Sequence, residues 1–147
     1  MGGTLIFIET EKDHYSKFFL IKGNKKEINK LLKAVKAIFK EPSTEKFLTQ
    51  INNLFEELKN KCIKDVEKFP FISANPIGEA KAIVLNYNRL PENLYAITIS
   101  KRVWQNPKDP SEKQISIETQ VIDHRGILTS FQRVLIMKGN VLFDAKF

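Results

Sequence analysis

A chain of 147 residues with 42% apolar and 28% charged side chains has the composition of an ordinary globular protein, and we expect residues 1–147 to form one domain. The single cysteine excludes the disulfide framework of small secreted proteins, and the net charge of +7 favours an acidic partner. No apolar stretch approaches the roughly 18 residues that cross a bilayer, so we expect no transmembrane segment and a cytoplasmic location.

The N-terminal residues 4–22 predict a strand, a polar turn and a second strand. The two apolar runs cover residues 5–8 and 18–21, and polar residues around Glu11 separate them. Near-continuous apolar runs of this length are typical of strands that are at least partly covered on both faces.

The next segment predicts two helices. Asn24 and Glu27 have the spacing of a capping box, which marks a helix N-terminus. Apolar residues then recur every three or four positions until Pro42 indicates a break. A second apolar stripe runs from Phe47 to Phe69, about seven helical turns, with acidic and basic residues mixed on its polar face.

The C-terminal half predicts five strands, after a loop at residues 70–79. These strands cover residues 80–87, 94–104, 115–122, 127–137 and 141–147. Apolar and polar side chains alternate in the second and third of them, and the short turns between strands indicate antiparallel hairpins. The order ββααβββββ predicts an α+β fold, in which a twisted antiparallel sheet has two helices packed on one face.

Most of the net charge lies on the first predicted helix. Residues 22–40 contain seven lysines against one acid, Glu27, and so carry +6 of the total +7. Helical spacing places most of these lysines opposite the apolar stripe, which predicts electrostatic binding of an acidic macromolecule. The alternative is a merely solubilising surface. The predicted binding residues are Lys25, Lys26, Lys30, Lys33, Lys36 and Lys40, which we call the lysine face.

A possible secondary binding group consists of Arg102, Trp104 and Arg133. The two arginines occupy polar positions of their predicted strands, so they are candidates for one sheet face. An aromatic side chain beside a cation can stack on a base or a sugar. A tryptophan at a strand end more often covers the edge of the core, and that is the position we expect for Trp104.

The chain offers little material for catalysis or metal binding. His14 and His124 each follow an aspartate in a predicted turn, and capping of backbone amides by Asp13 and Asp123 is the simpler interpretation. Cys62 lies on the apolar stripe of the second helix and is predicted to fill the core. No Cys/His cluster has metal-ligand spacing, and no glycine-rich phosphate loop is present. We predict no catalytic residue, no metal site and no cofactor.

Three hypotheses for the function follow. The preferred one is a non-enzymatic binding module that docks an acidic macromolecule, either nucleic acid or an acidic protein, through the lysine face. The alternative is a structural or assembly protein, a homo-oligomer that forms through the long second helix or through a sheet edge such as residues 141–147. The third is a cone-shaped α+β fold that binds a small ligand or acts as an enzyme.

Overall fold

The helices and strands follow the order expected from the sequence. The computed structural model describes residues 3–11 and 14–146, and it confirms the α+β class. One strand, β3, is additional to those predicted. The elements are β1 (Thr4–Glu9), β2 (His14–Lys22), α1 (Lys25–Phe39), α2 (Thr44–Lys61), β3 (Ile72–Ile77), β4 (Ala80–Asn86), β5 (Leu94–Gln105), β6 (Glu112–Asp123), β7 (Gly126–Lys138) and β8 (Val141–Asp144).

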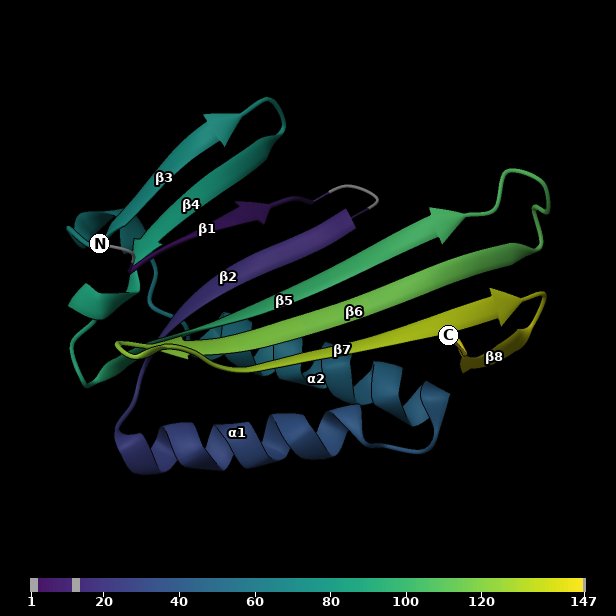
Figure 1. The fold of residues 1–147 in the computed structure, drawn as a ribbon, viewed down its shortest axis with the longest axis horizontal. Coiled ribbons are helices and arrows are strands. Elements are labelled where there is room, and N and C mark those ends of the chain that lie inside the picture. Colours follow the sequence, from purple (N-terminus) through teal and green to yellow (C-terminus); the bar gives the residue numbers. More distant parts are fainter. Residues whose placement is uncertain (1–2, 12–13, 147) are drawn as a thin grey trace.

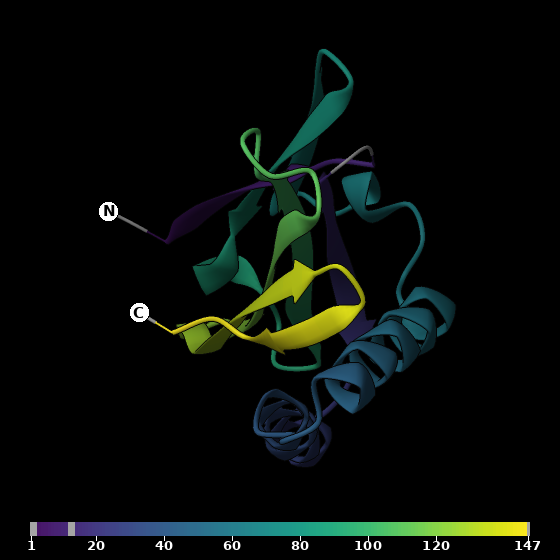
Figure 2. The same ribbon diagram turned by 90° about the vertical axis from the view of Figure 1, so that its right-hand side faces the viewer.

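The strands form two antiparallel sheets, where the sequence predicted one. The larger has the order β2-β5-β6-β7-β8 and the smaller the order β1-β4-β3. The five-stranded sheet is the middle layer: both helices cover one of its faces, as predicted, and the three-stranded sheet covers part of the other (Figure 1; Figure 2). Because other elements cover both faces of the middle sheet at this end, residues 94–100 of β5 are all buried.

Two apolar cores hold these layers together. The first lies between the helices and the five-stranded sheet, and includes Val35, Phe47 and Ile97. The second lies between the two sheets and includes Leu20 and Leu85. Alternation along β2 and β5 sends successive side chains to opposite cores, which explains why these strands read as near-continuous apolar runs.

The capping box predicted for α1 is present. The Asn24 side chain accepts a hydrogen bond from the Glu27 amide at 2.9 Å, and the Glu27 carboxylate accepts one from the Asn24 amide at 3.2 Å. The preceding Gly23 lies against Tyr95, where an added Cβ would be 2.8 Å from a ring carbon. The start of α1 is therefore fixed both by its cap and by this close approach.

Helix α2 is shorter than predicted. The expected helix continued to Phe69, but α2 ends at Lys61, and Cys62 packs beside it against the first core as expected. The amide of Ile63 then donates to the Leu20 carbonyl at 2.8 Å, and Asp65 has a φ of 55°. The apolar side chains after this break pack in the second core. The apolar residues before this break pack in the first core and those after it pack in the second. Their spacing in the sequence is that of one helix, although only the part up to Lys61 is helical.

Strand β3 lies in the segment that the sequence predicted to be a loop. It pairs with β4 through residues that include Asn75 and Pro76, both poor strand formers. Proline is tolerated here because β3 is an edge strand and needs amide donors on one side only. At the other end of the chain β8 stops at Asp144, and Phe147 lies outside the described residues, as do Asp13 and the side chain of His14.

The five-stranded sheet extends beyond the three-stranded one. The long hairpins of β5, β6, β7 and β8 continue to the right of β3 and β4 in Figure 1. There one sheet face packs on the helices, and no other element of the described chain is drawn over the opposite face (Figure 1). None of the helices in the described part of the chain is long and apolar enough to cross a membrane.

Candidate functional site

The lysine face is exposed along the whole of α1. All six of its lysines are exposed, whereas Ile28 and Val35 on the opposite side of the helix are buried. Lys26, Lys33 and Lys40 follow one another at seven-residue intervals, which places them on one stripe about 21 Å long. The helix therefore has a buried apolar side and exposed lysines along its length.

No carboxylate neutralises the lysine face within the described residues. The ion pairs found there join Lys17 to Glu11, Lys61 to Glu57, Arg125 to Asp123, and Arg133 to Asp144. None of them uses a lysine of α1. The only acid inside this helix, Glu27, accepts the capping hydrogen bond and keeps its negative charge, so it offsets one of the six lysine charges and the helix keeps a net positive field.

The neighbouring helix α2 shows how different the lysine face is. The polar side of α2 mixes signs and forms an (i, i+4) ion pair between Glu57 and Lys61 at 2.9 Å. On α1, by contrast, consecutive lysines from Lys26 to Lys40 are three or four residues apart, and each such like-charged pair destabilises a helix by about 0.2–0.5 kcal/mol. Two helices on the same sheet thus have different charge patterns, and only that of α1 carries an electrostatic cost.

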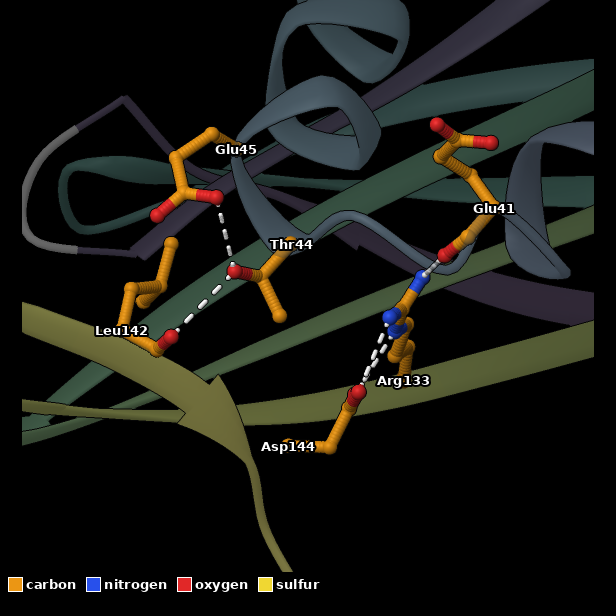
Figure 3. A network of polar contacts seen from close by, with 6 residues as sticks. All are labelled: Glu41, Thr44, Glu45, Arg133, Leu142 and Asp144. Atoms are coloured by element: carbon orange, nitrogen blue, oxygen red, sulfur yellow. Dashed lines mark hydrogen bonds and ion pairs between the residues drawn. The ribbon is translucent and has the colours of Figure 1, made fainter.

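Arg133 lies on the opposite face of the sheet from Arg102, which corrects the expectation that the two arginines share a face. Its guanidinium donates to both carboxylate oxygens of Asp144, at 2.7 and 2.9 Å, and to the Glu41 carbonyl at 2.6 Å (Figure 3). It also lies 4.6 Å from the centre of the Phe47 ring. The side chain points to the helix side of the sheet, where it joins β7, β8 and the α1–α2 connection.

The same region covers the outer edge of β8. The Ala145 amide bonds to the Val134 carbonyl, so alternation along the ladder turns the backbone of Leu142 away from β7. The Thr44 hydroxyl lies 3.2 Å from the Leu142 carbonyl oxygen and also 3.2 Å from the Glu45 carboxylate, and its one proton is shared between them (Figure 3). A backbone acceptor at this sheet edge is therefore already satisfied.

Trp104 does not cover the core, which corrects the expectation from its place near a strand end. Its side chain is 53% exposed and lies with Arg102 on the face of β5 that points away from the helices. The three-stranded sheet does not extend over this part of β5. Together with Gln114, Ser116 and other polar residues these two side chains line a shallow depression of about 530 Å³.

Sequence reasoning missed the polar residues of this depression. The signal was the polar alternation in β6, where Gln114, Ser116 and Glu118 occupy every second position. Alternation alone predicts an exposed face. It does not show that the face lies beside an exposed tryptophan, because that depends on the register between β5 and β6.

Asp123 at the β6–β7 turn caps a backbone amide, as predicted. Asp123 accepts hydrogen bonds from the amide and the side chain of Arg125, at 2.8 and 2.7 Å. Burial opposes ionisation of Asp123, but these bonds and the Arg125 charge keep its pKa below the usual value. His124 is exposed beside an open depression of about 560 Å³ at the N-terminus of α1. The Asp123 carboxylate beside His124 is bound by Arg125 and does not orient the imidazole.

Neither a metal cluster nor a relative points to a particular chemistry. Within residues 3–11 and 14–146 no group of three or more His, Cys, Asp or Glu side chains is placed to hold a metal ion. Comparisons with protein-family models, curated proteins and solved structures gave no match. The function has to be argued from the charges and side chains of the chain itself.

Proposed function

We propose that this chain is a non-enzymatic binding module that docks an acidic macromolecule, nucleic acid or acidic protein, through the lysine face of α1. The observation that carries the proposal is the exposure of all six lysines without an ion-pair partner among the described residues. A field of this kind attracts polyanions and raises their rate of association. Flexible lysine ammonium groups suit diffuse contact with phosphates or carboxylates, whereas arginine would favour bidentate recognition.

The charge pattern favours this proposal over a solubilising surface. Solubility needs only charged side chains, and α2 provides them with both signs and at no electrostatic cost. The four like-charged neighbours along the lysine face cost about 1–2 kcal/mol together. The helix dipole disfavours Lys25 and Lys26 near its positive end but favours Lys36 in the last turn, so the cost that remains is the repulsion between neighbouring lysines. Binding of an anion offsets these costs, which gives the pattern a physical reason.

The test compares two triple charge reversals. One variant changes Lys26, Lys30 and Lys33 to glutamate, and the matched control changes three exposed lysines elsewhere: Lys46, Lys59 and Lys108. Each variant reverses three charges, so both have a net charge of +1. The probes are a short fluorescein-labelled DNA duplex and labelled polyglutamate, followed by anisotropy at low salt.

The proposal predicts that the first variant loses binding to at least one probe and that the control retains most of it. If both variants lose binding equally, binding depends on net charge alone. If the first variant keeps its binding, the lysine face does not contact the probe. Either result overturns the proposal. Circular dichroism checks that both variants keep the helices.

A self-associating protein is the second candidate. It is supported by Ile6 and Ile77, which are 69% and 58% exposed on the outer strands of the three-stranded sheet. Exposed apolar side chains on edge strands favour pairing with another copy. The edge of β8 is less available, because the Leu142 carbonyl is satisfied by Thr44. Sedimentation velocity at increasing protein concentration tests this candidate: a monomer at every concentration contradicts it.

A further inference from the structure

We propose a second binding site, for an uncharged oligosaccharide, on the sheet face around Trp104. This uncovered face is the surface of β5, β6, β7 and β8 that points away from the helices and lies beyond the three-stranded sheet (Figure 1). The lysine face is on the other side of the same sheet, since α1 packs there. The two sites are therefore independent, and the second does not depend on the function proposed above.

The register of the strands defines the uncovered face. Trp104 pairs with Gln114, Gln114 with Ile136, and Ile136 with Phe143, so these four side chains form one row across β5, β6, β7 and β8. Phe143 is 43% exposed, and it ends the row three strand spacings, roughly 14 Å, from Trp104. The adjoining rows are Arg102, Ser116 and Val134, and then Ser100, Glu118 and Gln132.

The side chains of this face suit hydroxyl groups. Trp104 presents an open aromatic ring, which can cover the apolar C–H face of a sugar. Among the described residues that line the depression, Gln132 donates a hydrogen bond to the Ser116 hydroxyl at 3.3 Å, whereas none is found for the side chains of Arg102, Gln114 or Glu118. They offer cationic donors, an amide with both donor and acceptor, and an anionic acceptor. A sugar hydroxyl both donates and accepts, so a mixed set of this kind is complementary to it.

The balance of charge argues against a polyanion here. Arg102 and Glu118 are the charged side chains that line the depression, and their charges cancel. A nucleic acid would gain little from counterion release at such a surface. An extended peptide cannot add a strand in this position, because β6 and β7 are each paired on both sides. An uncharged ligand rich in hydroxyl groups satisfies both constraints.

The size of the face indicates an oligosaccharide rather than a single sugar. The depression of about 530 Å³ is shallow and open, and it shares Trp104 and Gln114 with the row that ends at the exposed Phe143. We expect the chain of the ligand to cross the strands along this row, with Trp104 under one ring and Phe143 under a ring further along. Phe143 then matters only for a ligand long enough to reach it.

The only tryptophan of the chain is Trp104, so its fluorescence reports on this site alone. The experiment titrates the protein with neutral gluco-, xylo-, manno- and chito-oligosaccharides at high salt, where the lysine face is screened. We expect a saturable shift of the emission with at least one series. Gln114→Ala weakens that ligand roughly fivefold and Gln50→Ala, the matched control on α2, leaves its affinity unchanged.

Two further variants test the proposal by calorimetry. We expect Trp104→Ala to reduce the affinity at least tenfold, and we expect Phe143→Ala to weaken the binding of long oligosaccharides but not of short ones. The proposal is overturned if no oligosaccharide series changes the emission, or if Gln50→Ala and Gln114→Ala weaken binding equally. A larger response to single-stranded DNA than to every sugar also overturns it, and identifies the face as a stacking platform for bases.

Discussion

Replacing Arg133 with methionine removes a guanidinium that joins three parts of the fold while it keeps most of the apolar stem. The guanidinium donates one hydrogen bond to the Glu41 carbonyl and two to the Asp144 carboxylate (Figure 3). It also lies over the Phe47 ring at 4.6 Å. The side chain of Arg133 is only 11% exposed, so water replaces these contacts poorly.

The expected loss of stability is about 2–4 kcal/mol. The part-buried hydrogen bond from the charged guanidinium to the Glu41 backbone carbonyl contributes about 1.5–3 kcal/mol. The ion pair contributes less, about 0.5–1 kcal/mol, because the Asp144 side chain is 51% exposed and solvent screens it. The contact with Phe47 adds about 0.5–1 kcal/mol. These terms share one side chain and do not add fully. For a chain of this length the melting temperature should fall by roughly 5–12 °C.

Urea unfolding followed by circular dichroism measures this loss, with Arg102→Met as the matched control. Arg102 is exposed on the opposite face of the same sheet, and its side chain has no hydrogen-bond partner among the described residues, so its replacement should change stability by less than about 0.5 kcal/mol. Equal effects of the two substitutions, or a loss below about 0.5 kcal/mol for Arg133→Met, would refute the role given to Arg133.

The stabilisation from Asp144 also depends on pH. Hydrogen bonding from Arg133, with its charge, holds the pKa of Asp144 below the usual 3.8. As the pH falls, the Asp144 carboxylate is therefore protonated in the unfolded chain before it is protonated in the folded one. The stabilisation from its ionised form is complete above about pH 4 and is lost as the pH falls through the folded-state pKa. We expect the stability difference between the wild type and Arg133→Met to narrow under acidic conditions. A constant difference down to low pH would contradict this assignment.

Three other predictions follow from the charges and edges of the fold. Lys33→Glu should weaken polyanion binding yet stabilise the protein by about 1–2 kcal/mol, because it replaces two repulsions with attractions to lysines three residues away; a lower melting temperature contradicts this. Burial, with the charges of two nearby glutamates, raises the pKa of Tyr95 to about 12. Above about pH 10 the tyrosine ionises in the unfolded chain first, so the free energy of unfolding should fall as the pH rises, and urea titrations of Tyr95→Phe should show a smaller fall. Thr44→Val frees the Leu142 carbonyl, and should cost about 1 kcal/mol and increase self-association in sedimentation; a strictly monomeric variant counts against edge protection.

The sequence predicted the local structure well wherever one periodicity served one core. The capping box at Asn24 and the apolar stripe of α1 are clear in the sequence, and both are present in the structure. The second stripe misled because Phe69 continues the helical spacing of α2 but packs in the other core. Strand β3 was missed because Pro76 is compatible with an edge strand, and edge position depends on pairing between distant segments.

Of the candidate binding residues, those on one helix could be placed from the sequence, whereas those on the strands could not. The lysine face was predictable because helical spacing fixes which side chains share a side of α1. Arg102 and Arg133 looked equivalent, since both occupy polar positions in amphipathic strands. Their fates differ because one sheet face meets the α1–α2 connection and the other is open there, which is a property of the tertiary fold. The same openness explains why Trp104 is exposed rather than part of a core.

The salt dependence of DNA binding tests the lysine face most directly. If Lys26, Lys30, Lys33 and Lys40 each contact one phosphate, the logarithm of the association constant should fall with the logarithm of salt concentration with a slope of about −3.6. Replacing Lys26, Lys30 and Lys33 with glutamine should reduce the size of that slope by about 2.7. A slope that stays the same in this variant would show that the duplex binds elsewhere and would contradict the account.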